Sequence, residues 1–233
     1  MGQSKRLRGK PGAPLAETGA VALAAPMVPL LIAALVATCQ GEPGRPAEGP
    51  CPGYADADWR RHATEEDRGR LRGWRPAWLE ALAQARGAGH QAEIAGEGVL
   101  LDPDAALPGV TPPPGDYACR TIKIGSPDDL LPYVAYPAFR CRIAMRGGRL
   151  SLVKLDGSQR PIGRLFGDTE RRLVFLGTMQ LGDERRAYEY GADRERDLIG
   201  ALERIGERRW RLVFPRPHFE SLLDVIELTP ASP

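Results

Sequence analysis

Apolar residues alternate with arginines along Phe139–Arg146. Successive side chains of a strand point to opposite faces of a sheet, so this pattern predicts a strand with one buried face. Gly147-Gly148 follows, and two glycines that can both take positive φ predict a tight hairpin turn. We therefore expect the chain to return antiparallel over Arg149–Leu155.

Further runs of apolar and β-branched residues recur at short spacing, with Gly and Asp residues between them. About eight strands is the number at which a small antiparallel barrel closes around side chains or one small ligand. We expect a mainly β, lipocalin-like barrel over residues 115–230, with a two-sheet sandwich as the alternative. LIGALERI in Leu198–Ile205 also fits a short helix. The predicted strands are Tyr117–Ile124, Tyr136–Arg146, Arg149–Leu155, Arg160–Phe166, Arg172–Met179, Leu198–Ile205, Arg209–Phe214 and Leu222–Leu228.

The segment before these strands has helical spacing. Thr64, with Asp67 three residues later, resembles a capping box. One apolar stripe follows, formed by Leu71, Trp74, Trp78 and Leu82. This pattern predicts a helical arm over residues 59–106, in which Pro76 kinks the helix or starts a second one. A Pro-rich connector at 107–114 then leads to the strands. For the tryptophans, packing against the barrel is favoured over ligand stacking.

The first 38 residues have the layout of a signal peptide: a basic start and then an uncharged, apolar run over residues 20–38. The run ends at Cys39, which resembles the lipidated cysteine of a bacterial lipoprotein. The alternative is ordinary cleavage nearby, with Cys39 paired to Cys51. Residues 39–58 have no hydrophobic periodicity and are expected to form a disordered tether.

The two remaining cysteines, Cys119 and Cys141, both fall in predicted strands. Cross-strand neighbours lie within the Cα separation that a disulfide tolerates, so we expect these two to be bridged. Two buried free thiols are the alternative. The sequence has no CxxC pair and no Cys/His cluster at metal spacing, and it has neither a P-loop nor a dinucleotide fingerprint, so neither a metal nor a cofactor is expected.

Charge argues against nucleic acid as a partner. The net charge of +2 depends on the leader, and without residues 1–38 the chain has 28 basic and 29 acidic residues. A nucleic-acid-binding protein needs concentrated positive charge along one face. Basic residues after the leader are arginines except for Lys123 and Lys154, a bias that we interpret as GC-rich coding.

One polar set stands out near the central hairpin. Gln159, Arg160 and Arg164 lie in the loop and strand that follow it, and Trp210 could join them from a later strand. A barrel mouth is a common place for a few polar groups above an apolar pocket, and Arg favours carboxylate or phosphate. We therefore predict a small anionic ligand here. The alternative is an Arg network that ties loop ends together.

Hydrolytic chemistry has less support. His218, Ser221 and Asp224 are the residue types of a triad, but they are close together in an extended segment and no G-x-S-x-G elbow is present. Glu203 and Glu227 could act as paired carboxylates only if both faced a cavity.

Several motifs in order resemble an uncharacterised family of exported proteobacterial proteins, domain of unknown function 4893. They are GDYACRTIKIG, YPAFRCRI, GSQRPIG, VFLG, ERIGERRWRLVFPRP and ESLLDVIEL, spread over about Trp59 to Pro230. The resemblance implies export in a Gram-negative bacterium, and it implies no activity or catalytic residue.

Taken together, these patterns predict an exported envelope protein in the periplasm or on the periplasmic face of the outer membrane, held to a membrane only through a lipid at Cys39. A non-enzymatic binding module is the favoured function, with a small anionic ligand or an envelope protein as its partner. A hydrolase-like enzyme that uses a barrel cavity is the alternative.

Overall fold

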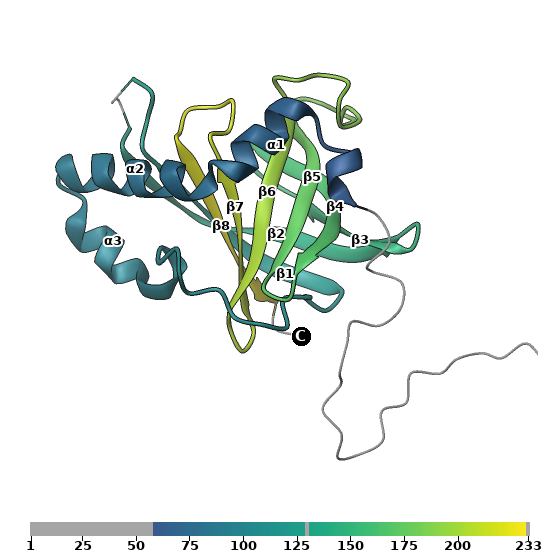
Figure 1. Ribbon diagram of the computed structural model, residues 1–233, viewed down its shortest axis with the longest axis horizontal. Coiled ribbons are helices and arrows are strands. Elements are labelled where there is room, and N and C mark those ends of the chain that lie inside the picture. The colour runs from purple at the N-terminus through teal and green to yellow at the C-terminus, as the bar shows by residue number, and fades with distance from the viewer. Residues whose placement is uncertain (1–57, 129–130, 232–233) are drawn as a thin grey trace, which may run out of the picture. The chain divides into compact units, whose positions relative to one another are not determined.

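Eight antiparallel strands form a closed barrel, in which each strand pairs with the next along the chain and β8 pairs with β1 (Figure 1). The computed structural model describes residues 58–128 and 131–231. It confirms the mainly β barrel over the two-sheet sandwich. LIGALERI is a strand and not a helix. The strands are β1 Gly115–Ile124, β2 Tyr133–Arg146, β3 Arg149–Lys154, β4 Gln159–Thr169, β5 Arg172–Leu181, β6 Asp197–Gly206, β7 Arg209–Pro215 and β8 Leu223–Pro230.

The central hairpin forms as its pattern predicts. Arg146 of β2 faces Arg149 of β3, and the two glycines between them have φ of 57° and 77°. Both values lie in the left-handed region, where a residue with a Cβ is strained. The turn therefore depends on glycine at both positions.

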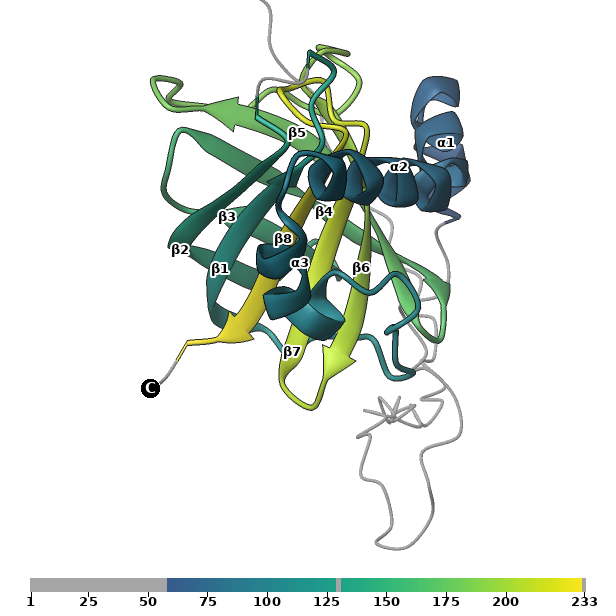
Figure 2. The ribbon, with the colours of Figure 1, turned by 90° about the vertical axis from the view of Figure 1, so that its left-hand side faces the viewer.

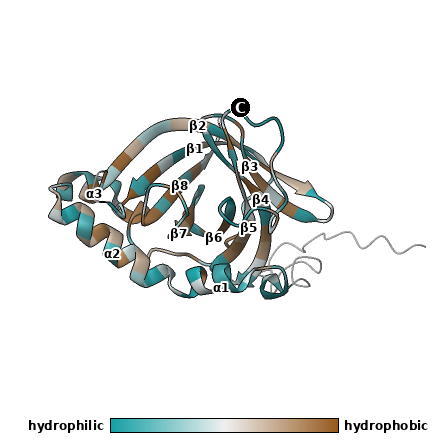
Figure 3. Ribbon diagram, turned by 90° about the horizontal axis from the view of Figure 1, so that it is seen from above, coloured by the Kyte–Doolittle hydropathy of each residue, from teal (hydrophilic) through white to brown (hydrophobic). Residues whose placement is uncertain are grey.

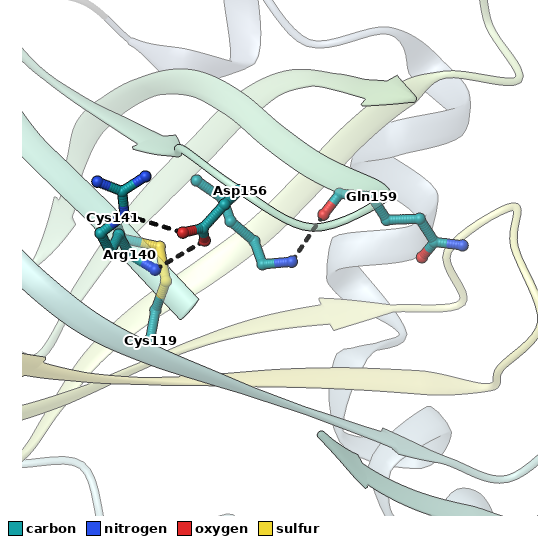
Figure 4. Close-up of a disulfide and its surroundings, with 6 residues drawn as sticks. Cys119, Arg140, Cys141, Asp156 and Gln159 are labelled. Carbon is teal, nitrogen blue, oxygen red and sulfur yellow. Dashed lines mark hydrogen bonds and ion pairs between the residues drawn. A yellow bond between two sulfur atoms is a disulfide. The ribbon is translucent and has the colours of Figure 1, made fainter. Parts of the chain in front are cut away.

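The barrel interior is an apolar core built from alternate residues of each strand, among them Ile143, Leu152, Phe175 and Phe214. The predicted disulfide lies in this core, with the Cα atoms of Cys119 and Cys141 5.8 Å apart (Figure 4). In the register, Cys119 faces Phe139 and Tyr117 faces Cys141. The bridge therefore joins diagonal neighbours on β1 and β2, not residues directly opposite each other.

Short helices cover one side of the barrel (Figure 3). They are η1 Trp59–Arg61, α1 Glu65–Arg72, α2 Trp74–Gly87, α3 Gln91–Glu97 and η2 Gly98–Leu100. The Thr64 side chain accepts a hydrogen bond from the backbone N–H of Asp67, as a capping residue does. Pro76 lies in the first turn of α2, where its missing N–H has no intrahelical partner to lose. Pro76 therefore belongs to the start of a second helix.

The apolar stripe of α2 packs on the outer wall of β1, β7 and β8 (Figure 2). Trp78 is fully buried there, and its indole N–H donates to the carbonyl of Leu101 at 3.2 Å. The tryptophan is thus a packing residue, as the spacing predicts. No helix in the described ranges is long and apolar enough to cross a membrane. The signal-peptide, tether and lipidation predictions, including Cys39 and Cys51, lie outside the described residues.

Candidate functional site

A cavity of about 120 Å³ lies inside one mouth of the barrel, at the end where the β3 to β4 and β7 to β8 loops meet. Its apolar walls come from the core residues Met179 and Ile226 together with Pro161. Polar and charged residues line the rest of the cavity: Lys123, Lys154, Ser158, Gln159, Glu220 and Asp224. The mouth therefore has the mixed character of small-molecule sites, an apolar body with a few polar groups.

Strand alternation carries both lysines into the interior. Lys123 lies two residues after Thr121 on β1, and Lys154 lies two residues after the core residue Leu152 on β3. They are the only lysines of the chain after residue 38. A barrel that otherwise uses arginine for its cations therefore places both of its lysines in one cavity.

Lys123 is paired with Asp224, which it faces directly across β1 and β8. Its Nζ lies 3.1 Å from Oδ2 of the carboxylate, and both side chains are buried. The Ser221 hydroxyl donates to Oδ1 of the same carboxylate. Burial raises the pKa of Asp224, while the Lys123 ammonium and the Ser221 hydroxyl oppose that rise.

Lys154 is buried without such a partner. Its residue is only 4% exposed, yet its Nζ makes no ion pair with any carboxylate in residues 58–128 and 131–231. The Nζ donates to the backbone carbonyl of Gln159 at 2.9 Å and lies 3.8 Å from the ring centroid of Phe139. Burial lowers the pKa of Lys154 to about 8, a change that the charge of Asp156 partly offsets. At neutral pH the amine is still mostly an ammonium ion.

The four residues predicted from the sequence to bind a ligand do not converge. Gln159 lines the cavity. Arg160 does not, because its guanidinium donates to backbone carbonyls, chiefly those of Gly157 at 2.9 Å and Leu181 at 2.7 Å. Those bonds tie the loop after β3 to the end of β5. Arg160 thus follows the alternative, an Arg that joins loop ends.

Arg164 and Trp210 lie elsewhere. Arg164 faces Ser151 across β3 and β4 and is exposed on the outer wall of the barrel. Trp210 lies in the interior near the start of β7, next to the turn at the other end, and its indole N–H donates to the carbonyl of Val110 at 2.8 Å. Sequence order alone could not separate these positions, because facing depends on the register of each strand.

The groups proposed for hydrolysis are also dispersed. The Nε2 of His218 lies 4.0 Å from Glu66, whereas Ser221 binds Asp224. Glu203 and Glu227 both lie on the outer wall, where each carboxylate is paired with two arginines. None of His218, Glu203 and Glu227 lines the cavity.

The lysines are the residues that sequence reasoning missed. Their signal was present in composition, since two lysines among so many arginines invite a specific explanation. Lysine has a compact ammonium on a flexible stem and loses its proton far more readily than arginine when it is buried. The sequence suggests Asp224 only as a triad member, and its pairing with Lys123 follows from the register of β1 and β8.

The fold and the cavity define the class: a small antiparallel β-barrel, closed by eight strands, with a charged cavity in one mouth. The chain belongs to the family described as Domain of unknown function (DUF4893), whose match covers residues 59–228. This confirms the resemblance to domain of unknown function 4893. Because the match begins at η1 and ends within β8, the helices and the barrel form one family unit. Comparison with curated proteins and with solved structures gives no match.

Proposed function

We propose that this protein is an exported, non-enzymatic binding protein whose barrel-mouth cavity takes a small anion such as a short carboxylate. One observation carries the proposal: Lys154 holds a buried ammonium that forms no ion pair with any carboxylate of the described residues. Buried charges in proteins are almost always paired, because an unpaired one loses its hydration without compensation. A bound anion supplies the missing partner.

The volume of the cavity limits which ligands fit into it. A volume of about 120 Å³ corresponds to roughly four water molecules at their share of liquid volume. Acetate or propionate fits this space, whereas a fatty acid or a nucleotide does not. The apolar floor of Met179 and Ile226 would contact the alkyl end, with the carboxylate toward Lys154.

Neighbouring groups support a singly charged ligand. Lys123 is already paired with Asp224 and, at 3.6 Å, with the more exposed Glu220, whereas Lys154 is a buried cation without an ion-pair partner in the described residues. Ser158 and Gln159 line the same mouth, and a hydroxyl and an amide are hydrogen-bond donors. A dianion would instead leave one negative charge without a partner.

Export is supported by the disulfide, since such bonds persist mainly in oxidising compartments. The periplasm or the periplasmic face of the outer membrane is the proposed location. Fractionation of cells that express Cys39→Ser checks the anchor. The variant should move from the membrane to the soluble periplasm if Cys39 carries lipid, and unchanged membrane retention would remove the anchor from the proposal.

Acetate titration tests the cavity directly. NMR shifts of the cavity methyl groups should follow acetate binding at pH 7 and show no response to neutral, similarly sized acetamide. Lys154→Met should weaken acetate binding about tenfold or more, as expected for loss of a charged hydrogen bond. Arg140→Met is the matched control, because Arg140 is an exposed cation paired with Asp156 outside the cavity (Figure 4); it should change the affinity less than twofold.

The same titration has a defined pH dependence. Acetate needs the protonated amine, and the pKa of Lys154 is about 8 in the free protein. Affinity should therefore be nearly constant between about pH 6 and 7, where acetate is ionised and the amine is protonated, and fall about tenfold for each pH unit well above 8. Equal responses to acetate and acetamide, or acetate binding that survives Lys154→Met, would overturn the proposal.

A further inference from the structure

A second concavity, separate from the barrel interior, lies on the outer wall of β3, β4 and β5. Its volume is about 470 Å³, within the usual range for small-molecule sites. The loop between β5 and β6, at the top of Figure 1, supplies Tyr188 and Tyr190 to it, and His62 lines it from the helical side. Tyr190 is fixed in place, because its hydroxyl accepts from the backbone N–H of Thr64 at 3.0 Å and donates to Asp67.

Three arginines line this outer groove as cross-strand neighbours. Arg146 and Arg149 face each other directly across β2 and β3. Arg164 faces Ser151, which is two residues from Arg149, so Arg164 is the diagonal neighbour of Arg149. Like charges placed directly opposite each other in a sheet are destabilising. The barrel therefore maintains an unfavourable concentration of positive charge here.

None of these three arginines is paired with an acidic side chain of the described residues. Within the described part of the chain, the side chains of Arg146 and Arg164 make no hydrogen bond or ion pair, and the guanidinium of Arg149 has one recorded interaction, with the ring of Phe166 at 5.0 Å from its centroid. Arg142, on the same outer face of β2, shows the usual situation: it is paired with Asp116 at 2.6 Å. The groove arginines are thus exceptional among their neighbours.

The groove also has a polar group without a partner. Thr178 lines it and is only 3% exposed, and its Oγ1 has no hydrogen-bond partner in the structure as described. Buried hydroxyls are normally hydrogen-bonded, and each exception calls for an explanation. A ligand oxygen or a water held by a ligand would satisfy it.

We infer that this outer groove binds a phosphate monoester. The three arginines and the single acidic lining residue, Glu189, leave about two positive charges, which matches the charge of about −1.5 to −2 on a phosphate monoester at pH 7. Guanidinium groups bind phosphate through paired, charge-assisted hydrogen bonds. The rings of Tyr188 and Tyr190 provide walls for the organic part of the ligand.

This inference does not rest on the proposed function, because the arginines lie on the outer face and Lys154 lies inside the barrel. The phosphate could belong to a soluble metabolite or to a lipid headgroup, and both present the same chemistry to the arginines. Two probes separate these sources. Phenyl phosphate is a soluble monoester with an aromatic body, and phosphatidylcholine vesicles with about one fifth phosphatidic acid present a monoester on a membrane.

The experiment measures phenyl phosphate binding by calorimetry and vesicle binding by flotation. Arg149→Gln and Arg164→Gln should each weaken phenyl phosphate binding about tenfold. Arg142→Gln, the matched control, removes one charge from the same face outside the groove and should change the affinity less than twofold. Phenol, which lacks the phosphate, should not bind.

A charge reversal separates ligand binding from folding. Arg149→Glu places opposite charges across β2 and β3, so the variant should melt at the same or a higher temperature while it loses phenyl phosphate binding. Flotation with phosphatidic acid vesicles that disappears in Arg149→Glu would assign the phosphate to a lipid, and phenyl phosphate binding without flotation would assign it to a soluble ligand. No binding to either probe, or equal weakening by Arg142→Gln, would overturn the inference.

Discussion

Two buried cations on opposite sides of the barrel wall have opposite surroundings. Arg211, on the outer wall under the helices, is 0% exposed and is fully paired: it binds Glu203 at 2.8 Å and donates to the carbonyls of Val99, Leu100 and Asp102. Lys154, inside the mouth, is almost as buried but has a single carbonyl and an aromatic ring as partners.

This difference separates a structural charge from a candidate functional one. The contacts of Arg211 hold the end of the helical segment on β7, and each of its three guanidinium nitrogens already has an acceptor in its own chain. Lys154 donates one of its three ammonium hydrogens to a carbonyl, has no acceptor among the described residues for the other two, and lines a cavity. Burial lowers the pKa of both cations. Geometry, not the pKa shift, therefore distinguishes their roles.

The largest expected change in the free energy of unfolding follows from loss of the paired cation Arg211. Arg211→Met should lower the free energy of unfolding by about 3–5 kcal/mol, because it leaves Glu203 and the helix-end carbonyls buried with fewer partners. Urea denaturation measures the change. Arg142→Met, which breaks an exposed pair with Asp116, should cost less than about 1 kcal/mol. Equal losses in the two variants would contradict the contrast between buried and exposed pairs.

Reduction of the disulfide between Cys119 and Cys141 should cause the second-largest loss of stability. The bond links residues 22 apart, and chain entropy predicts a loss of about 3 kcal/mol when such a loop is opened. Cys141 faces Lys154 across β2 and β3, so the bond also supports the cavity wall. Urea midpoints with and without dithiothreitol, and acetate titration of the Cys119→Ala/Cys141→Ala variant, measure both effects. An unchanged urea midpoint after reduction would mean that the disulfide does not stabilise the fold.

Arg160→Ala should have a smaller and purely structural effect. Its guanidinium holds the carbonyls of Gly157 and Leu181, so its loss should cost about 1.5 kcal/mol. Acetate affinity should stay within twofold of wild type among folded molecules. A loss of acetate binding without a loss of stability would return Arg160 to the ligand site.

Lys154→Met should have the smallest effect and the opposite sign. Replacing an unpaired buried ammonium with an apolar chain should raise the free energy of unfolding by about 1 kcal/mol in the absence of ligand. The pKa of Lys154, about 8, lies below its ordinary 10.5, so the folded protein bears the full cost of the charge below pH 8. The advantage of the Met variant should therefore shrink as pH rises from 8 toward 10.5. A destabilised Lys154→Met variant would mean that the ammonium is structurally satisfied.

The local pattern of residues was sufficient to predict the strands, the central hairpin and the disulfide. Period-2 alternation and the glycine pair at 147 and 148 depend on neighbouring residues, and all eight strands form close to their predicted bounds. Cys119 and Cys141 could be paired because consecutive strands usually lie side by side. The Thr64 cap and the apolar stripe through Trp78 are local in the same sense.

Closure of the barrel decided which polar groups meet. Lys123 and Asp224 are 101 residues apart and become neighbours only because β8 pairs with β1. Gln159 lines the cavity, whereas Arg164 lies on the outer wall as the diagonal neighbour of Arg149. A shift of one residue in the pairing of any of these strands would turn its inward side chains outward and its outward side chains inward. The amino-acid composition of the strand is the same in both cases, so composition does not reveal which side chains face the cavity. The sequence by itself therefore determined the strands and their order, and the tertiary register alone determined the cavity and the groove.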